Sequence, residues 1–90
     1  MSLSQPCRRP EIAWRVIDGE AIVVHPGAGV VYPLNPVATR CWELADGQHS
    51  VTAMVETVAR EFEAPLTQIQ QDVEHFLRTL QEKGLIDGGV

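Results

Sequence analysis

The sequence predicts one α+β domain in which a three-stranded antiparallel sheet is followed by three helices. Two observations support this order. Residues 12–17 have a period of two and are followed by short β-branched runs up to residue 32, whereas from residue 36 onward apolar residues recur at helical spacing. Turn and capping residues separate the segments. Ninety residues allow a single domain, which we place at residues 11–88, preceded by a flexible tail at residues 1–10 that contains two prolines.

The three strands are expected at residues 12–17, 21–24 and 30–32. Asp18-Gly19 lies between the first two strands and favours a type I′ hairpin, because both central residues of that turn have positive φ. The glycines within residues 25–29 indicate a second turn. A short third strand of Val30, Val31 and Tyr32 then completes an antiparallel meander.

Capping and breaking residues set the helix boundaries. Asn35-Pro36 starts the first helix and Asp46-Gly47 stops it. Ser50 caps the second, Pro65 ends that segment, and a third helix runs from residue 66 or 67 to Gly84. The apolar positions that share a helix face, or fold back at the end, are expected in the core: Val37, Ala38, Cys41, Trp42, Ala45, Val51, Met54, Val55, Val58, Ala59, Phe62, Ile69, Val73, Phe76, Leu77, Leu80, Leu85 and Ile86.

The charge distribution argues against nucleic acid as a partner. The net charge is −5, and residues 46–90 hold eight acids and three bases. An acidic surface repels phosphate backbones. No apolar run is long enough to span a membrane, and residues 1–10 lack the apolar segment of a signal peptide. Two cysteines, Cys7 and Cys41, are expected as free thiols in a cytoplasmic protein.

Neither a catalytic site nor a cofactor or metal site is predicted. The three histidines, His25, His49 and His75, have no ligand spacing to each other or to the cysteines. Cys41 lies on the apolar side of its helix, where a thiol is inert. Trp14 and Trp42 also occupy apolar positions, so we expect them in the core rather than stacked on a nucleobase.

Residues 12–87 resemble the PqqD family. The resemblance rests on an ordered set of short motifs rather than on one signature. These are Asp18-Gly19, the run Gly-Val-Val-Tyr-Pro-Leu-Asn at residues 29–35, Trp-Glu-Leu-Ala-Asp-Gly at residues 42–47, the helix at residues 55–62, Asp72-Val73, Phe76-Leu77, Leu80 and Gly84-Leu85-Ile86.

This resemblance implies a winged-helix-like RiPP recognition element. Such a domain is non-catalytic and holds the leader of a ribosomally synthesised precursor peptide for a modifying enzyme, often a radical SAM enzyme. The pathway is that of coenzyme PQQ or of another modified peptide. The leader is implied to add as a strand to the third strand, in a groove shared with the third helix. One wall would be Val30, Val31, Tyr32 and Leu34, and the other Asp72, His75, Phe76, Thr79 and Lys83.

Physical chemistry supports such a groove, because an extended peptide can satisfy the unpaired N–H and C=O groups of a sheet edge. The acidic third helix would favour a leader with Lys or Arg. Asp72 has a second interpretation as a capping or structural residue, and Tyr32 is either core or ligand contact. If the nitrogen of Pro33 points outward, the edge loses a donor; if it points inward, the sheet loses a bond.

Other functions compete with this interpretation. A winged-helix DNA-binding regulator would need basic residues on its recognition helix, whereas the second helix offers only Arg60 and the third only Arg78 and Lys83. A small enzyme would need a nucleophile, a base and an oxyanion donor together. A protein–protein adaptor that uses the same edge cannot be separated from a peptide binder by sequence. An open edge would also allow a homodimer.

Overall fold

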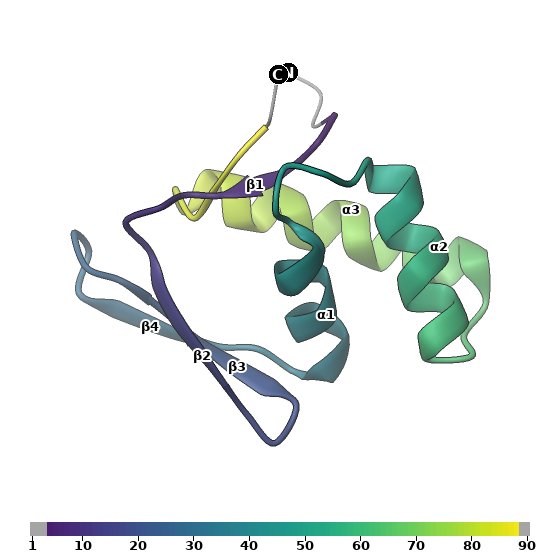
Figure 1. Ribbon diagram of the computed structural model, residues 1–90, viewed down its shortest axis with the longest axis horizontal. Coiled ribbons are helices and arrows are strands. Elements are labelled where there is room, and N and C mark those ends of the chain that lie inside the picture. The colour runs from purple at the N-terminus through teal and green to yellow at the C-terminus, as the bar shows by residue number, and fades with distance from the viewer. Residues whose placement is uncertain (1–3, 89–90) are drawn as a thin grey trace.

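The computed structural model describes residues 4–88 and confirms the predicted sheet followed by three helices (Figure 1). Strands β2, β3 and β4 form the sheet, and a second, two-stranded sheet of β1 and β5 was not predicted. The elements are β1 Cys7–Arg8, β2 Ala13–Ile17, β3 Glu20–His25, β4 Val30–Pro33, α1 Pro36–Leu44, α2 Val51–Glu61, α3 Leu66–Glu82 and β5 Ile86–Asp87.

The larger sheet is an antiparallel meander of order β2-β3-β4. Asp18 and Gly19 have φ values of 52° and 78°, as a type I′ turn requires, so the hairpin prediction is confirmed. In Figure 1 the meander lies on one side of the molecule and the helices on the other, with α1 between the sheet and α2. Both outer strands, β2 and β4, leave one edge without a strand partner among the residues that the structure describes.

The core lies between the sheet and the helices. Trp42 is fully buried at its centre, and nearly all of the predicted helical stripe residues are buried or packed against this core. Two expectations are wrong. Trp14 is 39% exposed because the edge strand β2 reaches beyond the helices, and Phe62 is 38% exposed because it follows the last residue of α2.

The predicted helix starts are confirmed by their caps. The Asn35 side chain accepts a hydrogen bond from the Ala38 N–H at 2.8 Å, and the Ser50 side chain accepts one from the Ala53 N–H at 3.1 Å. Helix α1 ends at Leu44, two residues before the predicted stop at 46–47. Among residues 4–88, no helix is long and apolar enough to cross a membrane.

The expectation of a flexible tail at residues 1–10 differs from the structure. Residues 1–3 of that tail lie outside the described residues. Pro6 is buried, and Cys7 pairs with Asp87 in the small sheet. The Arg8 guanidinium donates hydrogen bonds to the carbonyl oxygens of Trp42 and Glu43, both at 2.8 Å. Arg8 thereby binds carbonyls of the last turn of α1, where the Trp42 carbonyl also accepts from the Ala45 N–H at 3.2 Å. This anchors the segment before the sheet.

Candidate functional site

The open edge of β4 presents a defined set of main-chain groups. The Leu34 N–H donates to the Ala21 carbonyl at 2.8 Å, so Leu34 and Ala21 form a hydrogen-bonded pair. Along an antiparallel ladder, hydrogen-bonded pairs alternate with pairs whose main-chain groups point away from each other. With the register of β3 and β4, Tyr32 also turns its main-chain groups toward β3, whereas Val31 and Pro33 turn theirs away. The edge therefore offers the N–H and C=O of Val31 and the C=O of Pro33.

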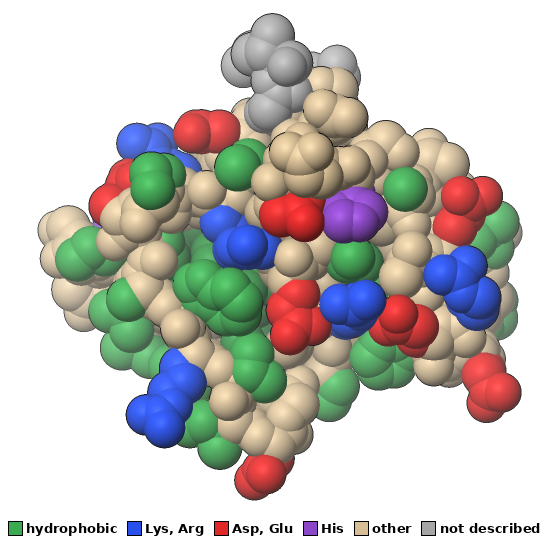
Figure 2. Space-filling view, in the orientation of Figure 1, with side chains coloured by type: hydrophobic (Ala, Val, Ile, Leu, Met, Phe, Trp, Pro, Cys, Tyr) green, Lys and Arg blue, Asp and Glu red, His purple; other side chains and the backbone are tan. Residues whose placement is uncertain are grey.

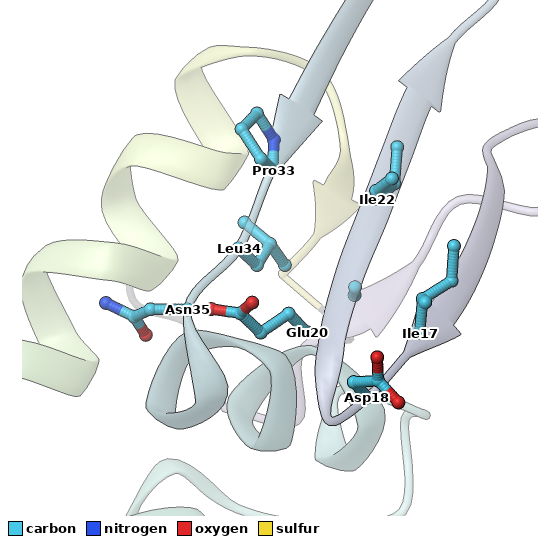
Figure 3. A pocket seen from close by; sticks show the side chains of 8 residues that line it. Ile17, Asp18, Glu20, Ile22, Pro33, Leu34 and Asn35 are labelled. Atoms are coloured by element: carbon cyan, nitrogen blue, oxygen red, sulfur yellow. The ribbon is translucent and has the colours of Figure 1, made fainter.

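This geometry decides between the two orientations of Pro33. Its nitrogen points away from β3, so the sheet loses no hydrogen bond and the open edge loses one donor. Of the β4 residues, all of which the structure describes, only Val31 has an N–H that points outward. Figure 3 shows Pro33 on β4, with α3 on the side away from β3.

Side chains of β4 alternate between two faces. Tyr32 lies opposite Val23, which is fully buried, so it faces the helices. Val31 lies on the outer face, where it is 56% exposed. Leu34 differs from the expectation, because its side chain is only 8% exposed and belongs to the core. Leu34 therefore cannot form an exposed wall beside β4.

Helix α3 runs beside β4 in the opposite direction. Beside β4, Lys83 Nζ lies 5.2 Å from the centre of the Tyr32 ring. Beyond the end of β4, Asn35 and Asp72 line one cavity. Tyr32 is half-buried, packs against the core and has Lys83 over its ring.

The other predicted residues of α3 differ in what they can contribute. Asp72 is exposed and accepts a hydrogen bond from Gln68 Nε2 at 3.0 Å. The Thr79 hydroxyl donates to the His75 carbonyl at 3.0 Å, which leaves the hydroxyl as an acceptor. The ring of Phe76 is half-buried and packs against the core. This side of α3 is thus apolar where it packs on the core and polar at its surface.

Two hollows flank the point where β4 leads into α1. The first has a volume of about 350 Å³, lies between α1 and α3, and is lined by Asn35, Val37, Ala38, Cys41, Ile69, Asp72, Val73, His75 and Phe76. The second, shown in Figure 3, has a volume of about 410 Å³ and is lined by Ile17, Asp18, Glu20, Ala21, Ile22, Pro33, Leu34 and Asn35.

Sequence reasoning missed the apolar wall residues of the first hollow that precede Phe76, which are Val37, Ala38, Cys41, Ile69 and Val73. Their helical spacing placed them in the core, and that spacing was the only signal available. A seam between two helices has the same apolar period as a fully packed interface. The pattern therefore could not indicate that α1 and α3 leave a hollow there.

The chemistry of these groups suits binding. Burial raises the pKa of the Cys41 thiol from 9.0 to about 12, so this wall residue is neutral at physiological pH and is not a nucleophile. Within residues 4–88, no group of three or more His, Cys, Asp or Glu side chains could hold a metal ion. What the site provides is a hydrogen-bonding edge beside apolar hollows with an acidic rim.

Comparison with known proteins places this geometry in context. Residues 20–86 match the family model of PqqD, coenzyme PQQ synthesis protein D. The sequence is 30% identical over 73 residues to the PqqA binding protein of Methylococcus capsulatus, a match that covers 81% of this chain and 74% of that protein.

Three solved structures share the fold. TbiB1 in complex with the TbiA(beta) leader peptide has a TM-score of 0.82 at 24% identity, over 91% of this chain and 95% of that one. A lasso peptide synthetase B1 complexed with the leader peptide has a TM-score of 0.81 at 21% identity, and the match covers 93% of this chain and 99% of that one. The PqqD truncation of Methylobacterium extorquens PqqCD, a stand-alone RiPP recognition element, has a TM-score of 0.74 at 18% identity. The match covers 91% of this chain and 87% of that one.

Proposed function

The chain belongs to the PqqD family, and from this membership we propose that it is a non-catalytic module that binds the leader of a ribosomally synthesised precursor peptide. The leader adds as a strand to the open edge of β4. The module then presents the precursor to a modifying enzyme in the cytoplasm, a radical SAM enzyme being one such partner. The pathway makes PQQ or another modified peptide.

The observation that carries this proposal is the open edge of β4 beside α3. A leader strand accepts a hydrogen bond from the Val31 N–H and donates to the carbonyl oxygens of Val31 and Pro33. These main-chain bonds bind an extended peptide without demanding a particular sequence. The relatives support the assignment, because one is named a PqqA binding protein and two were solved with leader peptides.

Selectivity arises from the surfaces on either side of the added strand. Successive side chains of a strand point to opposite faces, so alternate leader residues face α3 and the outer surface. On the helix side they meet Tyr32, Lys83 and the hollow between α1 and α3. The proposed contact residues are Val30, Val31, Tyr32, Asp72, His75, Phe76, Thr79 and Lys83, with Leu34 beneath them.

An amide NMR titration of the ¹⁵N-labelled chain tests this function. The probes are a synthetic precursor leader, a scrambled peptide of the same composition, and a DNA duplex. We expect saturable shifts at residues 30–34 and 72–83 from the leader alone. Shifts from DNA at these residues would favour the winged-helix regulator, and leader-induced shifts confined to other residues would contradict the β4 groove.

A further inference from the structure

The opposite edge of the sheet, at β2, also has outward-pointing main-chain groups. The type I′ turn makes Ile17 and Glu20 a hydrogen-bonded pair. The register then turns Arg15 toward β3, whereas Trp14 and Val16 turn their N–H and C=O groups away. This edge thus offers two donors and two acceptors.

The edge of β2 has little of the protection that soluble proteins give to open strands. Every residue of β2 is exposed, and Ile17 is 50% exposed. The strand contains no proline and no lysine, and its pairing with β3 has no bulge. Arg15 is its one charged residue. An exposed apolar edge without such features is a site where another strand adds.

The aromatic side chain at this edge is already held in place. The ring of Trp14 meets that of Trp42 edge to face, with centroids 6.1 Å apart. The Arg8 guanidinium carbon lies 4.9 Å from the Trp14 ring centre, and hydrogen bonds to α1 carbonyls hold the Arg8 side chain. A fixed Trp that is 39% exposed loses little further freedom on binding, which favours its use as an interface anchor.

The charges beside β2 indicate what kind of segment could add to its open edge. Arg8 and Arg15 form no ion pair within the described residues, and they flank β2 on its two faces: Arg8 with Trp14 on the helix side, and Arg15 on the outer side. In Figure 2 both basic and acidic side chains border the apolar patch over β2. Asp18 and Glu20 place negative charge at the hairpin end, and Asp46 lines a hollow with Arg8 and Trp14 at the other end of the strand. Within β2 itself the charge is therefore that of Arg15 alone, on a chain of net charge −5.

A second copy of this chain is disfavoured as the occupant. For Trp14 and Val16 of both copies to exchange hydrogen bonds, antiparallel pairing must be centred on Arg15. Two Arg15 side chains would then lie directly opposite each other, which destabilises a strand pair. The two copies would also each bring a net charge of −5.

We propose that the edge of β2 is a second docking site, which takes an extended segment of the partner enzyme in which apolar residues alternate with Asp or Glu. The proposal rests on the proposed function, in which such an enzyme receives the leader. Apolar side chains of the segment pack on Trp14 and Val16 on the helix face, and its carboxylates, which alternate with them, lie on the outer face beside Arg15. The two edges of one sheet then hold the peptide and the enzyme at the same time.

Two capped nine-residue peptides test this site by amide NMR, one alternating Val with Glu and the other Val with Lys. We expect the Glu peptide to shift the amides of residues 13–17 and the Trp14 indole, with the Lys peptide binding at least about tenfold more weakly. Arg15→Glu should reverse this preference, whereas Arg78→Glu, the same charge change on α3, should not. Val16→Pro should abolish the shifts by removing an outward donor.

The experiment separates this proposal from the leader site. Val31→Pro should leave Glu-peptide binding intact even where leader binding is lost. Equal binding of both peptides, or an unchanged preference in Arg15→Glu, would overturn the proposal. So would concentration-dependent shifts at residues 13–17 without peptide, which would identify a second copy as the occupant, or shifts there from a DNA duplex.

Discussion

The two outer strands of the sheet differ in the kind of edge they present. At β4 a proline leaves Val31 as the single outward donor, and α3 runs alongside, so a peptide added there meets a wall. At β2 two donors point outward beside Trp14 and Arg15. The β4 edge therefore limits a bound strand to few main-chain hydrogen bonds beside a helix. The β2 edge offers more main-chain hydrogen bonds beside exposed apolar side chains and Arg15. The difference originates in which residues the ladder turns outward.

The largest expected effect comes from removing one outward backbone N–H from each edge in turn, which tests whether the two edges bind different partners. Val31→Pro should weaken leader binding by about ten- to a hundredfold, because the leader loses the only outward N–H of β4. Val16→Pro makes the same change at β2 and should leave leader affinity unchanged. Isothermal titration calorimetry of the two variants measures this. Equal losses in both would show that the edges are not distinct.

A second substitution restores the donor that β4 lacks. Pro33→Ala adds an outward N–H, which should strengthen leader binding by about 1 kcal/mol. Because the Pro33 nitrogen points away from β3, the ladder stays intact and the free energy of unfolding should change by less than about 1 kcal/mol. Calorimetry and urea unfolding test the two parts. A loss of affinity in a stably folded variant would contradict the outward orientation.

A smaller effect concerns charge at the β4 groove. Asp72→Asn should slow association of a leader that carries Lys or Arg by about two- to threefold, since the carboxylate at the rim attracts it. Stopped-flow association at low and high salt measures this rate, and salt should reduce the difference. Glu56→Gln changes an exposed acid on α2 and is the matched control. Equal slowing by both variants would mean that overall charge alone sets the rate.

The smallest effect at neutral pH concerns Cys41, which lines the hollow beside β4. Its pKa is raised from 9.0 to about 12 by burial, so the folded state favours the neutral thiol. This contribution to stability is complete below pH 9 and is lost as the pH rises toward 12. Urea unfolding should show a steeper alkaline decline for the native chain than for Cys41→Ala. Parallel declines would show that Cys41 is not the cause.

Local signals in the sequence predicted most of the fold. Asp18-Gly19 fixed the hairpin because its turn type demands positive φ at both residues. Asn35 and Ser50 fixed two helix starts because their side chains satisfy backbone donors that no helix can satisfy itself. These signals lie within a few residues of the feature they determine, so a single chain contains them in full.

What the sequence could not provide depends on contacts between distant residues. The direction of the Pro33 nitrogen follows from ladder register, which the β4 segment alone does not specify. Strands β1 and β5 have two residues each, too few to show a period, and they form because residues 7–8 meet residues 86–87. Trp14 has the pattern of a core residue, but its exposure depends on where the helices stop covering the sheet.

The pairing of β1 with β5 has a consequence for protein engineering. Because Cys7 lies opposite Asp87, the chain enters and leaves the fold side by side (Figure 1). A unit with adjacent ends can be inserted into a surface loop of another protein without forcing that loop apart. For the same reason a short linker could join the ends and new ends could be opened elsewhere. This fold is thus suited to circular permutation and to transplantation into a host enzyme.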